Sequence, residues 1–236
     1  MERDDGHDAI SNLPDSVLLH ILSFLPTRDA MRTVMVPGFR YLWTSTCHLS
    51  FDHCPYHNCK ERKTAFRINE RLVNFTDCAL TLHKNPTIDL FSLNINYAAE
   101  EDPYDPQYEG GMTEETIRSD KIDTWIHFAA NRKVKFLGLD FLGCAREFTH
   151  NLYRLPCIVL GCSSLVELKL ASCEVGPVAG RVQLRSLRKL FMKKIHLTDK
   201  KLAEILSHSP LLRELSLEYC YGLRNPISVV PHLLKS

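Results

Sequence analysis

Six thiol and imidazole side chains lie within thirteen residues of one another, and together they have the chemistry to bind a metal ion. These side chains are Cys47, His48, His53, Cys54, His57 and Cys59. Zinc favours four such ligands in a tetrahedron. However, the spacing lacks the two short ligand pairs that are typical of zinc fingers and ribbons. We therefore expect a polar connecting loop without a metal, and a structural zinc site is the alternative.

The other polar residues form no catalytic motif of a known type. The sequence has no glycine-rich phosphate loop, no nucleophile elbow and no helix-borne zinc motif. Its eleven histidines are dispersed, at no fixed offset from an acidic or thiol partner. Nine cysteines, an odd number spread over 236 residues, are not typical of a disulfide framework. We predict that the protein is not an enzyme, needs no cofactor and uses most cysteines as small core residues.

Charge and hydropathy argue against two classes of partner. The formal net charge is +1, from 29 basic and 28 acidic residues, whereas nucleic-acid-binding surfaces have a basic excess. The N-terminal residues are acidic, and no apolar run is long enough to span a membrane. We expect neither nucleic acid nor a membrane as partner, and a location in the cytoplasm or nucleus.

Residues 13–26, LPDSVLLHILSFLP, contain an apolar stripe that a helix would gather on one face. Pro14 suits a first helical turn, and Pro26 ends the helix. A stripe of this kind either packs in the core of a small domain or binds a partner, and its spacing fits both. It consists of Val17, Leu18, Ile21, Leu22 and Leu25.

A second, short helix is predicted directly after the first. Thr27 would supply its capping oxygen, and Asp29 a negative charge in its first turn. Pro37 and Gly38 should end this helical region early. Aromatic residues at 39–43 then close a compact helical unit by about residue 50. Such a small core often needs a partner.

Between this unit and the C-terminal half, residues 63–83 have the apolar spacing of helical turns. Residues 88–95 suggest a short leucine-rich strand with Leu90, Leu93 and Ile95 at its apolar positions. Residues 98–113 are rich in acidic residues, with prolines and glycines, which is typical of a solvated surface loop.

Four segments of nine residues superpose without gaps and form an internal repeat. Each has apolar residues at its first, fourth, sixth and ninth places, and the alternation predicts a strand with one buried face. Successive segments start 31, 22 and 25 residues apart, close to the spacing of leucine-rich repeats. Cysteine exchanges with leucine and isoleucine at the ninth place, which predicts core cysteines there. The segments begin at Val134, Leu165, Leu187 and Leu212, and their ninth places are Leu142, Cys173, Ile195 and Cys220.

Helical sequence lies between the predicted strands. Ser119 and Asp199 are predicted to cap two helices. Because no single unit covers its own apolar face, strand-then-helix units stack into a curved solenoid. The expected fold class is therefore α/β: a mostly helical N-terminal module, then a solenoid with a curved parallel sheet and helices on its convex side. The helices are predicted to bury Ile122, Trp125, Ile126 and Ala129 in the first, and Leu202, Ile205 and Leu206 in the second.

Side chains between the buried leucines would form one panel on the concave face, which suits recognition of another macromolecule. Phe191 is the best single candidate, because an exposed aromatic side chain amid charge is typical of interface hot spots. The alternative is that these are solvated strand residues. The candidates for target binding are Asp140, Lys169, Lys189, Phe191, Lys193 and Glu218.

The succession DAISNLPDSVLLHILSFLPTRDAMRT, followed by RYLWTS, resembles the F-box of the plant F-box/leucine-rich-repeat/FBD family. DKIDTWIHFAANRKVKFLGLDF and SLVELKLASC are similar to the repeat region of that family. The resemblance implies an F-box that docks on the Skp adaptor of a cullin-RING ubiquitin ligase, and repeats that bind an unidentified target protein. The role would be non-catalytic, since it acts by proximity. By resemblance, the positions that form or support the adaptor surface are Leu13, Pro14, Val17, Leu18, Ile21, Leu22, Leu25 and Pro26.

These patterns divide the chain into a disordered tail at 1–8, the F-box at 9–50 and a linker with a helical lead-in at 51–86. The leucine-rich-repeat region would occupy 87–236, incomplete at its C-terminal end. Family members usually continue into a C-terminal FBD segment that this sequence does not match. The expectation is a short or a truncated family member.

One segment departs from the family pattern. Where the family usually has SVLSKRWRYLW, this chain has VMVPGFRYLW, with Pro37 and Gly38 in place of basic residues and Phe39 in place of tryptophan. Proline and glycine disfavour a helix interior by roughly 3 and 1 kcal/mol, which predicts a shortened or distorted third helix. The expected function is a substrate receptor of a ubiquitin ligase. The alternative is a repeat module with a degenerate F-box that works outside any ligase.

Overall fold

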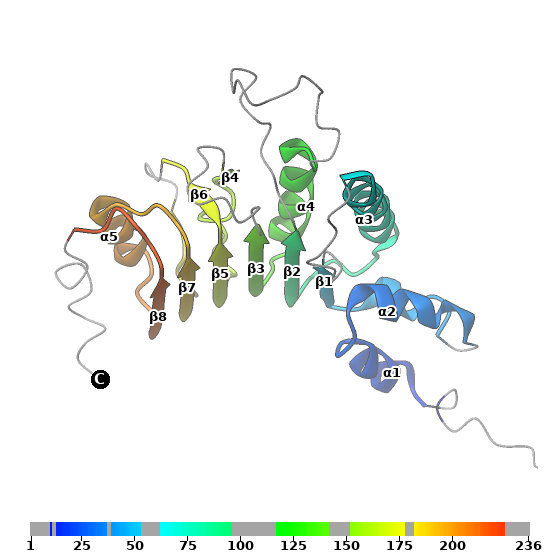
Figure 1. The fold of residues 1–236 in the computed structure, drawn as a ribbon. Helices are drawn as coiled ribbons and strands as arrows, with labels where there is room; N and C mark the ends of the chain where they lie inside the picture. The colour runs from blue at the N-terminus through cyan, green and yellow to red at the C-terminus, as the bar shows by residue number, and fades with distance from the viewer. Residues whose placement is uncertain are drawn as a thin grey trace, which may run out of the picture.

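The structure is a computed structural model that describes residues 10, 13–36, 39–52, 62–95, 117–141, 152–177 and 182–224, with side chains in the 62–82 helix from residue 70 onwards. Two short α-helices come first, α1 (Asp15–Leu22) and α2 (Thr27–Arg32). Two 3-10 helices follow, η1 (Thr33–Met35) and η2 (Leu42–Ser45). This helical module lies at one end of a curved sheet (Figure 1).

The main sheet has six parallel strands in the order β1-β2-β3-β5-β7-β8. Three helices lie on the outer side of the curved row of strands (Figure 1). The predicted α/β fold class is thereby confirmed. The strands are β1 (His48–Asp52), β2 (Leu90–Ile95), β3 (Phe136–Phe141), β5 (Glu167–Ala171), β7 (Lys189–Lys193) and β8 (Glu214–Glu218), and the helices are α3 (Arg62–Leu82), α4 (Ser119–Asn131) and α5 (Asp199–Ser207).

The predicted repeat is confirmed in register as well as in position. Strands β3, β5, β7 and β8 are the four repeat segments, paired without a bulge. Their fourth places face one another across the sheet, as do their sixth places, so each set forms one continuous apolar row. The rows are Leu137, Leu168, Leu190 and Leu215, and Leu139, Leu170, Met192 and Leu217.

The sheet begins earlier than predicted. Residues 48–52, expected to belong to a polar loop, form β1, which pairs with β2 over five residues. Leu49 and Phe51 are buried on the helix-covered side. In β2 the buried positions are Phe91, Leu93 and Ile95, and Leu90 is half-buried. The main sheet therefore includes a strand that lies before residue 87.

The helices bury the predicted residues but begin with different caps. Thr198, not Asp199, caps α5, since its side chain accepts a hydrogen bond from the Lys201 amide. Helix α4 follows Arg118 without a side-chain cap. The Thr27 hydroxyl caps no helix either, because it accepts a 2.8 Å hydrogen bond from the Ser50 amide and so ties α2 to β1.

In each repeat from β5 onwards, the residue directly after the strand has a left-handed backbone. Ser172, Lys194 and Tyr219 have φ of 53°, 52° and 53°, and all three occupy the eighth place of the repeat. The chain turns there toward the helix side and forms a second row of parallel pairs, which starts with β4 (Tyr153–Leu155) and β6 (Cys173–Val175). Cys173 is fully buried, which raises the pKa of its thiol to about 12. The prediction of a core cysteine is confirmed there, whereas Cys220 is only half-buried.

No helix among the described residues combines the length and the hydropathy needed to cross a bilayer.

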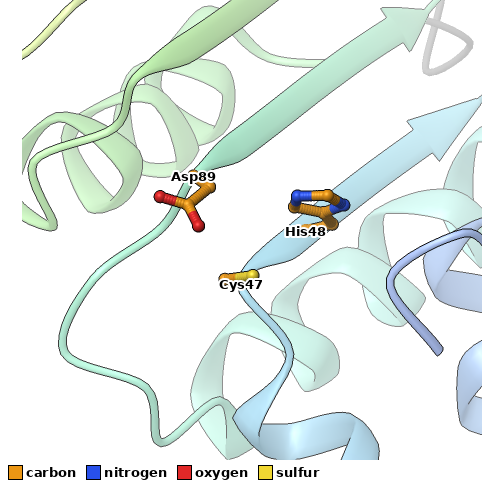
Figure 2. A group of neighbouring side chains, drawn as sticks. All are labelled: Cys47, His48 and Asp89. Atoms are coloured by element: carbon orange, nitrogen blue, oxygen red, sulfur yellow. The ribbon is translucent and has the colours of Figure 1, made fainter. Parts of the chain in front are cut away.

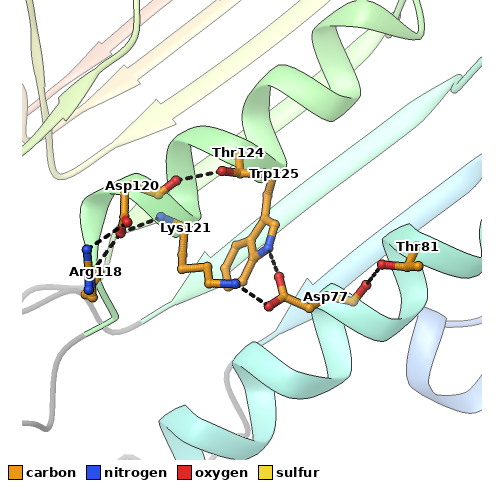
Figure 3. Close-up of polar contacts among 7 residues, drawn as sticks. All are labelled: Asp77, Thr81, Arg118, Asp120, Lys121, Thr124 and Trp125. Atoms are coloured by element: carbon orange, nitrogen blue, oxygen red, sulfur yellow. Dashed lines mark hydrogen bonds and ion pairs between the residues drawn. The ribbon is translucent and has the colours of Figure 1, made fainter.

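A carboxylate on α3 joins that helix to α4 (Figure 3). The indole Nε1 of the buried Trp125 donates a 2.8 Å hydrogen bond to Asp77 Oδ1. Lys121 Nζ lies 2.6 Å from Asp77 Oδ2. The two contacts connect the neighbouring helices α3 and α4 on the outer side of the sheet.

Replacing Asp77 separates these two contacts. Asp77→Ala leaves the indole N–H of Trp125 without its acceptor, so we expect a loss of about 1–3 kcal/mol in the free energy of unfolding. Asp77→Asn keeps an acceptor oxygen and loses only the partly exposed ion pair, at a cost of about 1 kcal/mol or less. Urea unfolding of both variants measures the difference. Equal losses would contradict the assignment of the stability to the indole hydrogen bond.

His83, directly after α3, connects the helical module to the sheet region. Its Nε2 lies 2.8 Å from the Thr46 carbonyl oxygen, and its ring packs edge-on against Phe128. Burial is the main cause that lowers the His83 pKa; the contact with the Thr46 carbonyl oxygen acts in the opposite direction, and the nearby Arg132 lowers the pKa further. The folded protein therefore favours the neutral form of this imidazole.

The free energy of unfolding should consequently decrease as the pH falls through a defined range. Above the unfolded pKa of about 6.5 both states hold a neutral imidazole, whereas below it only the unfolded state takes up the proton. The free energy of unfolding should decrease as the pH falls from that value toward the lowered folded pKa. Urea unfolding over a pH series should show a smaller decrease in His83→Gln, and an unchanged decrease in the exposed-site control His208→Gln.

Candidate docking surfaces

Helix α1 has two apolar sides, and only one of them is covered by the protein. Pro14 and Pro26 stand at the N-caps of α1 and α2. The prediction that Pro26 ends the first helix is wrong, because α1 already ends at Leu22. Leu18 and Leu22 are each only 1% exposed and belong to the core, where α1 packs on η2. Ile21 is 39% exposed. The predicted stripe is therefore divided between a buried side, which supports the helix, and an open side.

Exposed apolar side chains are concentrated in the helical module. Fifteen large hydrophobic residues are exposed in the described part of the chain, and ten of them lie between residues 10 and 41. We call the set the apolar docking surface. It gains Phe24 and Met35, 74% and 85% exposed, which the helical periodicity of the stripe does not include. The surface consists of Ile10, Leu13, Val17, Ile21, Phe24, Leu25, Val34, Met35, Val36 and Tyr41.

The segment that departs from the family pattern contributes residues to this surface. No α-helix forms between residues 33 and 46; the described residues there contain only η1 and η2, as the proline and glycine predicted. Pro37 and Gly38 themselves lie outside the described residues. Phe39 is buried, and its amide donates a 3.1 Å hydrogen bond to the Val36 carbonyl. Phe39 thus fills a core position, while Val36 and Tyr41 on either side remain exposed.

The division of α1 into two sides can be measured by truncation. Leu18→Ala should lower the free energy of unfolding by about 2–5 kcal/mol, because it leaves a cavity in the core. Ile21→Ala should change it by no more than about 1 kcal/mol, since the side chain is already partly exposed to solvent. Denaturant unfolding of the two variants checks this. A large loss in Ile21→Ala would mean that the open side also packs against the protein.

Part of the candidate metal cluster lies at the start of β1 and β2. One ligand-type atom from each of Cys47, His48 and Asp89 lies within 4.8 Å of the others (Figure 2). Asp89 forms a 2.7 Å ion pair with Lys135, which lowers its pKa, and His48 Nδ1 lies 2.8 Å from the Ser23 carbonyl oxygen. Burial and the neighbouring Asp89 raise the pKa of the Cys47 thiol. Such contacts fit a polar junction between α1, β1 and β2.

The other four residues of the candidate metal cluster lie outside the described residues. The expectation that no metal binds here therefore stays a prediction. The four are His53, Cys54, His57 and Cys59.

The second candidate surface is the side of the sheet that the helices leave uncovered, which we call the open face. Its side chains stand in rows, because every strand pair is in register. One row runs through Ser92, Gly138, Lys169, Phe191 and Ser216, and the next through Asp52, Asn94, Asp140, Ala171, Lys193 and Glu218. A groove of about 350 Å³ lies along both rows.

The charged candidates on β5, β7 and β8 contact one another. Lys169 pairs with Glu167 at 2.8 Å and lies over the Phe191 ring, 5.2 Å from its centroid. Lys189 and Lys193 pair across strands with Glu214 and Glu218, at 2.8 and 3.4 Å. The structure thus places five of the six predicted target-binding residues in three neighbouring groups of contacts on β5, β7 and β8, whereas Asp140 lies on β3. Their role in binding a target stays a prediction.

Comparison with known proteins identifies the two halves of the chain. A family model of the F-box domain matches residues 10–47, and a model described as At1g61320/AtMIF1, LRR domain, matches residues 107–234. Neither describes a catalytic domain. The F-box match contains the apolar docking surface, and the LRR match contains the strands from β3 to β8.

Relatives in Arabidopsis thaliana align over nearly the whole chain. F-box/LRR-repeat protein 25 is 32% identical over 219 residues, which are 92% of this chain and 70% of that protein. F-box/FBD/LRR-repeat protein At5g56420 is 29% identical over 220 residues, or 91% of this chain and 44% of that protein. F-box/LRR-repeat protein At5g02910 is 30% identical over 218 residues, 92% of this chain and 40% of that protein. The chain spans less than half the length of the last two.

Sequence, fold and relatives agree, and the resemblance to the plant F-box/LRR proteins is confirmed. The chain belongs to the F-box/leucine-rich-repeat protein family, with an F-box followed by a leucine-rich-repeat domain.

Proposed function

We propose that this protein is the substrate-recognition subunit of an SCF-type E3 ubiquitin ligase. Its apolar docking surface binds a Skp-type adaptor and, through it, a cullin, while the open face of the sheet binds the target protein. The subunit itself is non-catalytic: it holds the target near a ubiquitin-loaded enzyme, and so raises the effective concentration of the reacting groups. The proposal requires a location in the cytoplasm or nucleus, where the ligase works.

The observation that carries the proposal is the uneven distribution of exposed apolar side chains. Monomeric proteins rarely leave large contiguous apolar areas in water, and such areas mark interaction sites. Here two thirds of the exposed large hydrophobics of the described residues fall in the small segment that matches the F-box. Burying them in an interface would contribute about 25 cal/mol for each Å² of apolar area removed from water.

The test is co-purification with a Skp-type adaptor. Ile21→Asp places a carboxylate among the residues of the apolar docking surface, so the bound complex would bury an unpaired charge, and we expect adaptor binding to weaken at least about tenfold. Leu211→Asp is the matched control, because Leu211 is also an exposed aliphatic residue but lies just before β8. This control should bind the adaptor as the wild type does. Leu18→Asp is unsuitable, since Leu18 is a core residue.

A second candidate function has one observation in its favour, the change at residues 36–39. If the 3-10 segments misplace Val36 and Met35, the adaptor surface is incomplete, and the protein acts as a repeat module outside any ligase. Folded wild-type protein that retains no more adaptor than Ile21→Asp would favour this second function and contradict the first. Circular dichroism of all variants establishes that each is folded.

A further inference from the structure

Charge on the open face is compensated on one half of the sheet and not on the other. On β5, β7 and β8, each of the three lysines of the face has its glutamate. On β1 and β3, Asp52 and Asp140 form no ion pair with any described residue. Asn94 of β2 lies between them in the same row. The described half of the face on β1 to β3 therefore carries two carboxylates and no paired cation.

Asp140 and Asn94 are also unsatisfied as hydrogen-bonding groups. Both side chains are half-buried, and the Oδ1 atom of each is buried without a hydrogen-bond partner among the described residues. A buried acceptor without a donor costs about 1–3 kcal/mol, and such a group in a native protein calls for an explanation. Burial raises the pKa of Asp140, whereas the cations Lys193 and Lys194 lower it from a distance. Lys193 is already engaged by Glu218.

Small residues keep the groove open beside Asp140. Gly138 precedes it by two residues on β3, and Ala171 is its paired neighbour on β5. Neither can fill the space above the sheet, and both line the groove together with Asn94, Asp140, Lys169 and Phe191. Its volume of about 350 Å³ falls within the range of small ligand sites.

We propose that this groove receives a basic side chain, arginine or lysine, of the target protein, with its cationic group on the Asp140 carboxylate. The inference rests on the proposed function, because it assumes that the open face binds a target. A guanidinium or ammonium group supplies the positive charge that Asp140 lacks, and it can donate hydrogen bonds to the part of the Asp140 carboxylate that lines the groove.

The other kinds of occupant fit the groove less well. An anionic group would meet Asp140 directly, and the lysines that could attract it are already paired. An apolar side chain would bury the Asp140 carboxylate further without a partner, which is costly. Charge complementarity therefore selects a cationic group.

The experiment selects binders from a displayed library of random linear peptides on the full 236-residue chain. We expect selected peptides to share a lysine or arginine. Replacing that residue by citrulline in arginine peptides, or by norleucine in lysine peptides, removes the charge and should weaken binding about tenfold or more. Asp140→Asn, which keeps the shape of the side chain, should weaken the parent peptide by a similar factor. Asp120→Asn is the matched control, since it removes a carboxylate that is already paired, with Arg118, and that lies on α4 outside the groove, so binding should change little.

Three results would overturn the inference: no selected binder, binders without a common basic residue, or binders whose affinity is the same for wild type and Asp140→Asn. Ala171→Leu provides a second route, because it fills the groove without altering charge and should also weaken binding. Asp140→Asn and Ala171→Leu should both bind a Skp-type adaptor as the wild type does. If the wild-type protein binds no adaptor, that result counts against the proposed ligase function and not against the groove.

Discussion

Every strand of the main sheet has one apolar side, and no repeat is large enough to cover that side alone. Stacking in register solves the problem, because the leucines of successive strands form continuous rows beneath the helices. The first strand, β1, would leave its edge open, but the helical module covers it. Thr27 accepts a hydrogen bond from the Ser50 amide, and Ser23 holds His48. The module is thus attached to the sheet by directional bonds at the edge strand.

This attachment explains why one small helix has two roles. Leu18 and Leu22 are buried in the core where α1 packs on η2, so they cannot also contact a partner. The other apolar side of α1 stays exposed, because a helical module of this size is too small to cover it. Because the module is fixed to β1, anything bound on its outer side has a defined orientation relative to the open face. A proximity-based function depends on that geometry.

The repeats were predictable from sequence because their apolar periodicity is uninterrupted and repeats four times. Strand β1 was not, since its alternating Leu49 and Phe51 lie among cysteines and histidines that suggest a polar loop. The stripe on α1 was predicted as a unit, but its division depends on where η2 packs, and periodicity cannot show which flank is covered.

The caps and the groove show two further limits of the sequence. Thr198 and Asp199 are adjacent potential caps, and only backbone geometry distinguishes them. The groove could not be found at all from sequence. Asn94 and Asp140 are neighbours only because β2 and β3 pair in register across a long intervening segment.

Because the strands pair without gaps, the position of each residue on the open face follows from its residue number. One step to the next strand is about 4.8 Å and two residues along a strand about 6.6 Å. The chain leaves the main sheet at the positive-φ residues Ser172, Lys194 and Tyr219, which directly follow β5, β7 and β8. Variation in repeat length falls in the return segments beyond them. Insertions there can change the outer layer without moving any residue of the open face. A single insertion within a strand would instead turn the open-face residues of that strand toward the core.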